Sequence, residues 1–183
     1  MNSIIGIAGA FGSGKSLLGE ILQELGFEKI TLSQFLEEEL TKKSKRKITR
    51  KKLQDLGNEW RKKYGNAVLV EKALDLAKEN NWEKVVIEGF RNAEEVKRLR
   101  KEKNFLLVSL VVNRSIRYER LKDLKRREAL TKELFDELDD RDLGIGEKEY
   151  GLHTAICVAM ADVFIENNGS RENLARKVKE AVK

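Results

Sequence analysis

Short runs of apolar residues alternate along the chain with longer stretches in which apolar residues recur every three or four positions. The runs predict β-strands and the longer stretches predict amphipathic helices, because side chains alternate between the two faces of a strand but return periodically to one face of a helix. The predicted strands are 4–8, 29–32, 84–87, 105–112 and 163–166. The predicted helices are 16–25, 33–40, 49–63, 67–79, 92–103, 115–127, 132–142, 152–160 and one that follows Ser170. This alternation predicts an α/β fold with a parallel sheet covered by helices.

Residues that favour helix N-caps precede many of these helices. Their short polar side chains can accept a hydrogen bond from the first free amides of a helix. Asn92 is followed three residues later by Glu95, which is the spacing of a capping box. The expected caps are Ser33, Thr49, Asn66, Asn92, Thr131 and Ser170.

Composition limits the class of protein. The chain has 183 residues, 40% of them hydrophobic, and shows no linker or repeat, so we expect a single domain over 1–183. No apolar run approaches the roughly 18 residues of a membrane span, and the N-terminus lacks the basic and apolar regions of a signal peptide. We therefore expect a cytoplasmic protein without membrane partners. A single cysteine, Cys157, and a single histidine, His153, exclude an intrachain disulfide and a cysteine-rich or histidine-rich metal site, and both read as structural residues.

The net charge of +6 is concentrated in one segment. Residues 42–63 hold eleven Lys and Arg and two acids, so the rest of the chain is slightly acidic. This segment could guide a polyanionic acceptor, either a nucleotide or a nucleic-acid end. It could equally be a solvated loop and helix, and we favour this second interpretation because runs of charge are usually just exposed.

The strongest functional signal lies between the first strand and the first helix. The segment Gly9-Ala10-Phe11-Gly12-Ser13-Gly14-Lys15-Ser16 fits the phosphate-loop pattern G-x-x-x-x-G-K-[ST]. Glycines allow successive amides to converge on phosphate oxygens, and the helix N-terminus adds partial positive charge. We expect Lys15 to reach the β- and γ-phosphates and the Ser16 hydroxyl to ligate Mg²⁺. ATP is the expected nucleotide, because no Asn-Lys-x-Asp string that would specify guanine occurs.

Two further charged residues follow a strand that reads as buried on both faces. Glu88 and Arg91 come at the end of the 84–87 strand, where ligands of open α/β sheets bind. Phosphoryl transfer chiefly requires fixed cations around the moving group, so we interpret Arg91 as a functional residue that supplies one of them. We interpret Glu88 as a metal-site residue that holds Mg²⁺ through water. Arg141, which lies among acids, reads as an ion-pair partner instead.

The chain resembles the P-loop nucleotide kinases related to dephospho-CoA kinase and the nucleoside monophosphate kinases. Ile30-Thr31-Leu32-Ser33, followed by Phe35, is similar to the start of their acceptor site. Val86–Arg91 resembles their Asp-Gly-hydrophobic-Arg element, with Glu88 in place of the usual Asp. Arg117, Arg120 and Arg126-Arg127 resemble the arginines at the entrance of their lid, and residues 139–170 resemble the C-terminal region of dephospho-CoA-kinase-like proteins.

The resemblance implies a three-layer P-loop NTPase fold with a five-stranded parallel sheet in the order 2-3-1-4-5. It further implies an acceptor-binding helical segment over 33–80 and a lid over 114–145. Residues expected to contact nucleotide are Gly9, Phe11, Gly12, Ser13, Gly14, Lys15, Ser16 and Arg120. Catalytic roles are expected for Lys15, Glu88, Arg91 and Arg120, and acceptor binding for Ser33, Phe35 and Arg91.

The function that these observations favour is Mg²⁺-ATP-dependent phosphorylation of a small nucleotide-type acceptor, either a (deoxy)nucleoside monophosphate or dephospho-CoA. A phosphate acceptor is already ionised and needs no general base, whereas a hydroxyl acceptor would need Glu37 or Glu88. The alternatives are an ATP-binding regulatory or nucleic-acid-associated module and a polynucleotide 5′-hydroxyl kinase. The sequence leaves the oligomeric state open.

Overall fold

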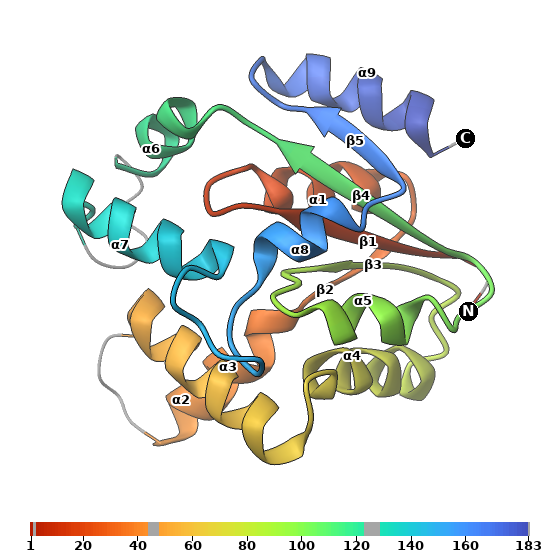
Figure 1. Cartoon of the computed structure of the whole chain (residues 1–183). Coiled ribbons are helices and arrows are strands. Elements are labelled where there is room, and N and C mark those ends of the chain that lie inside the picture. The colour runs from red at the N-terminus through yellow and green to blue at the C-terminus, as the bar shows by residue number, and fades with distance from the viewer. Residues whose placement is uncertain (2, 44–47, 123–128, 183) are drawn as a thin grey trace.

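The structure is a computed structural model that describes residues 1, 3–43, 48–122 and 129–182. Five parallel strands form one sheet in the order β2-β3-β1-β4-β5, which confirms the predicted architecture (Figure 1). The strands are β1 (Ser3–Gly9), β2 (Glu28–Thr31), β3 (Lys84–Glu88), β4 (Phe105–Val111) and β5 (Val163–Glu166). Because all strands are parallel, their carboxyl ends lie at one edge of the sheet.

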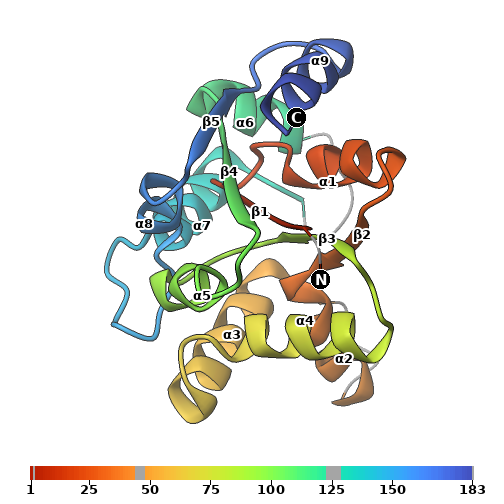
Figure 2. The same cartoon turned by 90° about the vertical axis from the view of Figure 1, so that its right-hand side faces the viewer.

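Helices cover both faces of this sheet and make three layers. They are α1 (Lys15–Glu24), α2 (Leu32–Lys43), α3 (Arg50–Tyr64), α4 (Val68–Glu79), α5 (Ala93–Leu99), α6 (Arg114–Lys122), α7 (Lys132–Leu143), α8 (Thr154–Ala159) and α9 (Arg171–Ala181). Helices α1 and α9 lie on one face, and α4, α5 and α8 lie on the other (Figure 2). Helices α2 and α3 pack beside α4, and α6 and α7 lie beyond the carboxyl ends of the strands (Figure 1).

Two hydrophobic cores explain why β3 is apolar without alternation. Val85 and Ile87 pack into the core beneath α4, α5 and α8, whereas Val86 packs into the core beneath α1 and α9. All three side chains are fully buried. A strand covered on both faces has no solvent side, so every position is filled by an apolar residue.

Four of the six predicted N-caps form in the structure. Thr49, Asn92, Thr131 and Ser170 each accept an amide hydrogen bond at the start of a helix, and Asn92 with Glu95 forms the predicted capping box. The predictions for Ser33 and Asn66 are wrong. Helix α2 already begins at Leu32, directly after β2, and the N-cap of α4 is Ala67.

Two predicted helix lengths also need correction. Helix α5 ends at Leu99 rather than at residue 103, because the chain turns there toward β4. Helix α8 is shorter than predicted and begins only at Thr154, since Gly151 and Leu152 are held in the loop that precedes it. The remaining boundaries agree with the predictions to within a few residues wherever the structure describes the chain.

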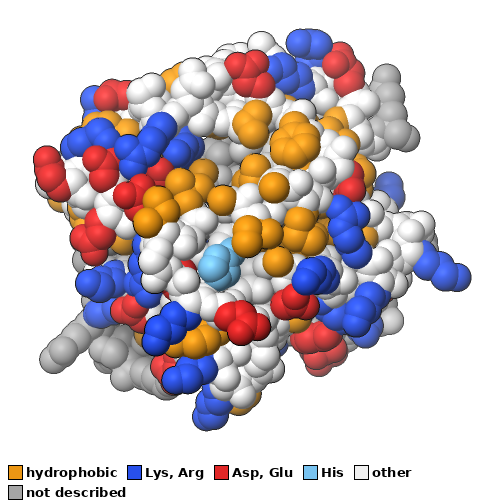
Figure 3. Space-filling model, in the orientation of Figure 1, with side chains coloured by type: hydrophobic (Ala, Val, Ile, Leu, Met, Phe, Trp, Pro, Cys, Tyr) orange, Lys and Arg blue, Asp and Glu red, His pale blue; other side chains and the backbone are white. Residues whose placement is uncertain are grey.

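The face of the molecule drawn in Figure 3 carries charged and apolar side chains. Exposed hydrophobic side chains gather over α8 and β5, among them Ile156 and Phe164 (Figure 3). Of the helices in the described ranges, none combines the length and the apolar character that spanning a bilayer requires.

Candidate phosphate-binding and acceptor site

The phosphate loop connects β1 to α1 and depends on glycine conformations. Gly12 and Gly14 have φ angles of 81° and 90°, in the left-handed region that other residues avoid. A Cβ atom at Gly14 would also lie 2.6 Å from the Nδ2 atom of Asn167. That amide donates a hydrogen bond of 2.9 Å to the Ser13 carbonyl, so the loop after β5 closes against the phosphate loop. Helix α1 starts at Lys15 without a side-chain cap, which leaves its first amides for another acceptor.

The Lys15 ammonium bridges two carbonyls of the same loop. Its Nζ atom donates to Gly9 O at 2.8 Å and to Ala10 O at 3.0 Å. Burial, and then the neighbouring charge of Arg91, lower the pKa of Lys15 to about 7, with a further contribution from Arg50. An anion with several charges placed beside Lys15 would raise this pKa again, because opposite charge favours the protonated amine.

Ser16 and Glu88 meet at the start of α1 and the end of β3. Ser16 Oγ lies 3.3 Å from Glu88 Oε1, which also accepts a 2.8 Å hydrogen bond from Thr31 Oγ1. The Lys29 ammonium lies 3.3 Å from the same oxygen. Glu88 is almost completely buried, and its second oxygen, Oε2, is buried without a hydrogen-bond partner among the described residues.

This arrangement fits a hard divalent cation. A hydroxyl and a carboxylate are ligands that Mg²⁺ prefers, and the buried Oε2 atom of Glu88 has unused acceptor capacity. Within the described ranges no cluster of three or more His, Cys, Asp or Glu side chains could hold a metal. A cation beside Ser16 and Glu88 would take its remaining ligands from phosphate oxygens and water. Lys29, which the sequence analysis overlooked, supplies positive charge at this corner.

A second group of charges forms around Asp142 at the end of α7. Its Oδ1 atom accepts from Arg91 Nε at 2.9 Å and from Arg50 Nη2 at 3.1 Å. Its Oδ2 atom accepts from Thr154 Oγ1 at 3.3 Å. Asp142 is fully buried, and although burial opposes ionisation, Arg91, Arg50 and then Lys15 together hold its pKa below the ordinary value. Asp142 is therefore charged and joins two guanidinium groups from distant segments.

Glu95 provides the second buried acid behind the arginines. Its Oε1 atom accepts from Arg61 Nε at 3.2 Å, and both side chains are buried. Its Oε2 atom accepts from the backbone amide of Arg91 at 2.7 Å and from that of Asn92 at 3.1 Å. The capping box of α5 thus also fixes the backbone from which Arg91 extends.

Helices α6 and α7 are tied to the phosphate loop. Arg117 forms a buried ion pair with Asp139 of α7 and donates to the Phe11 carbonyl at 2.8 Å. The Phe11 ring stacks on Phe135 of α7, with ring centroids 6.0 Å apart, and carries the Arg50 guanidinium 3.9 Å above its centre. The predicted lid segment therefore packs directly on the loop.

Arg120 lies on the same helix as Arg117 but contacts a different part of the site. Its Nη2 atom donates to the Gly169 carbonyl at 3.2 Å, in the loop after β5. Arg126 and Arg127, which were also compared with lid arginines, lie outside the described residues.

One cleft of about 660 Å³ lies between the phosphate loop and the arginines Arg50, Arg91 and Arg120, which line it. The phosphate loop and the end of β3 form one part of its wall, and α2, α3 and α6 contribute much of the rest. Predicted site residues that line it are Phe11, Gly12, Gly14, Lys15, Ser16, Ser33, Glu88, Arg91 and Arg120. Glu37 lines it too and accepts a 3.3 Å hydrogen bond from Ser33 Oγ. Phe35 does not line the cleft, because its ring packs against the core beneath α4.

The basic segment separates into an inner and an outer part. Arg50 and Arg61 line the cleft, contrary to our interpretation of the segment as solvated. Lys51 conforms to that interpretation, since it is exposed and only 3.9 Å from Glu137. Lys45, Arg46 and Lys47 fall outside the described residues. The helical period explains why neighbours differ: Arg50 and Lys51 point about 100° apart around α3.

The residues interpreted as structural occupy structural positions. Cys157 is fully buried, and burial raises the pKa of its thiol, so it is not a reactive nucleophile. The His153 ring lies 2.9 Å from the Lys148 carbonyl. Arg141 pairs with Glu147 at 2.6 Å and with Asp55 at 2.7 Å, although neither acid is its immediate sequence neighbour.

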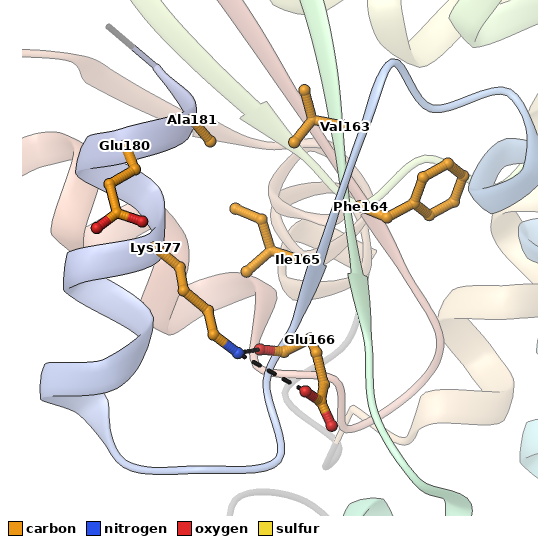
Figure 4. A pocket seen from close by; sticks show the side chains of 7 residues that line it. All are labelled: Val163, Phe164, Ile165, Glu166, Lys177, Glu180 and Ala181. Carbon is orange, nitrogen blue, oxygen red and sulfur yellow. Dashed lines mark hydrogen bonds and ion pairs between the residues drawn. The ribbon is translucent and has the colours of Figure 1, made fainter.

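A second hollow, of about 420 Å³, lies between β5 and α9 (Figure 4). Figure 4 shows Lys177 extending from α9 to Glu166, whose carbonyl it contacts at 2.8 Å. This hollow contains no residue of the phosphate loop. Of these two hollows, only the larger cleft contains the phosphate loop.

Comparisons with known proteins relate the chain to one family profile and to several UPF0200 proteins. A family profile described as an AAA domain matches residues 5–143. A UPF0200 protein of Thermococcus kodakarensis is 34% identical over 98% of this chain and 96% of its own length. A UPF0200 protein of Sulfurisphaera tokodaii is 31% identical over the same two shares. A UPF0200/UPF0201 protein of Archaeoglobus fulgidus is 30% identical, but the chain spans only 54% of its length.

Solved structures of kinases share the fold. A shikimate kinase of Acinetobacter baumannii, in complex with shikimate, matches with a TM-score of 0.61 and 18% identity over 98% of this chain and 92% of its own. A gluconokinase of Sinorhizobium meliloti matches with a TM-score of 0.56 and 18% identity over 97% and 89%. At this identity the likeness concerns the fold, which is that of the P-loop kinases.

Proposed function

This chain belongs to the UPF0200 family, and from the geometry of its phosphate loop we propose that it is a Mg²⁺-ATP-dependent phosphotransferase acting on a small nucleotide-type acceptor. The observation that carries the proposal is the convergence of Lys15, Ser16 and Glu88 with the guanidinium groups of Arg50 and Arg91 on one cleft. Phosphoryl transfer needs cations on both sides of the moving group and little else from the protein. The cleft offers both sets.

The donor side is the phosphate loop. Backbone amides of the phosphate loop and of the first turn of α1 would bind phosphate oxygens of ATP. The loop residues given this role are Gly9, Phe11, Gly12, Ser13 and Gly14. Lys15 would exchange its bonds to the Gly9 and Ala10 carbonyls for phosphate oxygens. Arg120, anchored on Gly169, would contact the nucleotide from α6 and assist transfer. These roles rest on position along the cleft.

Ser16 and Glu88 would hold Mg²⁺. When bound, the ion neutralises phosphate charge and so makes the terminal phosphate a better electrophile. Thr31 and Lys29 both contact Oε1 of Glu88 and so fix the orientation of the carboxylate. The other oxygen, Oε2, would then face the cation in a defined direction. The extra methylene of Glu relative to Asp favours an interaction through water.

The acceptor side is formed by Arg50, Arg91 and Ser33. The guanidinium groups of Arg50 and Arg91 both contact Asp142. Together they could bind a phosphate, which accepts several hydrogen bonds at once. A nucleoside monophosphate would present such a group as the nucleophile, already ionised. Dephospho-CoA would instead offer a hydroxyl, and Glu37 is then the better base, since Glu88 already interacts with Lys29 and Thr31. Phe35, whose ring lies in the core, is not proposed to contact the acceptor.

The proposal is tested by transfer from γ-labelled ATP to a panel of acceptors. The panel holds ribo- and deoxynucleoside monophosphates, dephospho-CoA, shikimate, gluconate and an oligonucleotide with a 5′-hydroxyl. Saturable transfer to one of the first two classes supports the proposal. Transfer to shikimate or gluconate supports a kinase but overturns the nucleotide-type acceptor, and transfer to the oligonucleotide identifies a polynucleotide kinase. ATP binding without transfer to any acceptor favours a regulatory module.

A further inference from the structure

Asp142 does not line the cleft itself but contacts Arg50 and Arg91, two cations that do. It is fully buried at the end of α7, and three donors from three separate segments converge on its carboxylate. These donors are Arg91 after β3, Arg50 at the start of α3 and Thr154 at the start of α8. No motif in the sequence pointed to it, and the proposed transfer does not use it directly.

A negative charge at this position has two opposing effects on anion binding. By Coulomb's law alone, the Asp142 carboxylate repels an incoming phosphate and weakens its binding. By geometry, the carboxylate fixes two long side chains that would otherwise lose rotamer freedom each time an anion binds. The second effect is complete only when further contacts fix those parts of each side chain that the carboxylate does not hold.

Both arginines have such contacts. Arg91 Nη1 donates to the Phe90 carbonyl at 2.8 Å, and its backbone amide is held by Glu95. The Arg50 guanidinium lies over the Phe11 ring at 3.9 Å. Asp142 therefore takes one nitrogen of each guanidinium, Nε of Arg91 and Nη2 of Arg50, while other bonds fix their planes. A guanidinium carries five N–H donors, and the contact with Asp142 uses only one nitrogen of each.

We propose that Asp142 is a positioning residue that sets Arg50 and Arg91 as a fixed pair for an anionic group of the acceptor. This inference rests on the proposed function, because it takes the pair as the acceptor side of the cleft. Asp142 touches neither reacting phosphate. It links the predicted lid helix α7 to the acceptor segment and to the end of β3, so the pair is complete only when α7 is in place.

The experiment measures binding rather than transfer, so it can fail independently of the proposed function. Inorganic phosphate is titrated calorimetrically into protein saturated with Mg²⁺ and the non-hydrolysable analogue AMP-PNP, which fills the donor side. Arg91→Gln shows that the phosphate reports on the arginine pair. Asp142→Asn removes the charge with little change of shape, and Asp142→Glu keeps the charge but displaces it by one methylene.

The two variants separate position from charge. A positioning role predicts that both weaken phosphate binding about tenfold or more, while the affinity for AMP-PNP changes much less. A mere counter-charge predicts tighter phosphate binding in Asp142→Asn and an unchanged value in Asp142→Glu, and either result would overturn the inference. So would the failure of the wild-type protein to bind phosphate, or its binding with undiminished affinity in Arg91→Gln.

Two further variants serve as controls for folding and for general charge. Thr154→Val removes the third donor to Asp142 but leaves both arginine contacts, and should bind phosphate like the wild type. Asp140→Asn removes a neighbouring acid of α7 that is 51% exposed in its side chain and lies 3.5 Å from Arg114. If Thr154→Val weakened phosphate as strongly as Asp142→Asn, the effect would be structural and the positioning role would be refuted.

Discussion

Ser16 Oγ and Glu88 Oε1 lie 3.3 Å apart although the two residues are separated by 72 positions in the chain. The contact exists because β1 and β3 are neighbours in the parallel sheet, with Ile7 beside Glu88, so that their carboxyl ends open into the same cleft. A hydroxyl and a carboxylate are ligand types that Mg²⁺ prefers, and here they meet at the phosphate loop.

The first prediction concerns this pair. Glu88→Gln keeps the hydrogen bonds from Thr31 and Ser16 in reach but removes the charge that a divalent cation needs. ATP affinity in EDTA should change little, whereas the gain in affinity on adding Mg²⁺ should fall about tenfold. Calorimetric titration of ATP with and without Mg²⁺ measures both quantities. An undiminished Mg²⁺ effect in the variant would remove Glu88 from the metal site.

The second prediction concerns Lys15 and stability. In the unfolded chain its pKa is the ordinary 10.5, and in the folded protein it is about 7. Burying the charged amine therefore lowers the free energy of unfolding. This loss is complete below about pH 7, where the amine is protonated in both states, and it disappears as the pH rises toward 10.5. Lys15→Met removes this cost. The stability of the variant relative to the wild type should be highest below pH 7 and should fall as the pH is raised.

Urea unfolding of the unliganded proteins at about pH 6.5 and about pH 9.5 tests this sign. The loss of the bonds to the Gly9 and Ala10 carbonyls affects both pH values alike, so the difference between them isolates the charge. Lys177→Met, on α9 and away from the cleft, is the matched control and should show no such difference. A relative stability that rises with pH would contradict the lowered pKa.

Proton uptake during ATP binding is the third prediction. A triphosphate beside Lys15 should raise its pKa well above neutrality, so near pH 7.5 the amine gains a proton as ATP binds. Calorimetry of ATP binding in buffers of different ionisation enthalpy measures this uptake directly. We expect a fraction of a proton per ATP near pH 7.5, and a smaller uptake near pH 6, where Lys15 is already charged. Equal uptake by Lys15→Met would assign the proton to another group.

The fourth prediction separates donor from acceptor binding. Arg91→Lys retains a positive charge but loses the planar fork that contacts Asp142 and the Phe90 carbonyl. The KM for the acceptor should rise about tenfold or more, and the KM for ATP should stay within about threefold. Arg141→Lys, whose partners are Glu147 and Asp55, is the control with both constants unchanged. Parallel increases in both constants would place Arg91 on the donor side instead.

The fifth prediction concerns the buried pair that holds α7 to the phosphate loop. Asp139→Leu leaves the Arg117 guanidinium buried without its carboxylate and should lower the free energy of unfolding by about 3 kcal/mol. Asp136→Leu, one turn earlier on α7 with a side chain 41% exposed, should lower the free energy of unfolding far less. Chemical denaturation compares the two variants. Equal losses would mean that burial does not govern the Arg117 pair.

The sequence predicted what short-range chemistry determines. Thr49 and Ser170 cap helices because a hydroxyl reaches an amide three residues away, and β3 is continuous in apolar residues because both faces are covered. Ser33 fails as a cap because α2 starts directly from β2, so tertiary packing decides the first turn. The phosphate loop can be recognised for the same reason, because all its residues are consecutive in the sequence, from Gly9 to Ser16.

Ser33 and Arg91 could be singled out from the sequence, but the contact between Arg50 and Asp142 could not, because it forms only when distant segments fold together. Arg50 and Asp142 are 92 positions apart, and nothing around either residue distinguishes it from the many exposed charges of this chain. The helical period does place Arg50 and Leu53 on neighbouring faces of α3, and Leu53 is buried. Applied to the basic segment, this helical period predicts that Arg50 faces the interior and Lys51 faces solvent.

The measurement that tests the central claim most directly follows the γ-phosphoryl group of labelled ATP at fixed Mg²⁺, with and without acceptor, in the wild type and in Lys15→Met. The account predicts that label passes to a small acceptor and exceeds label released as inorganic phosphate. It also predicts that Lys15→Met lowers transfer by at least about a hundredfold. Label found only in inorganic phosphate, at a rate independent of every acceptor, would contradict it.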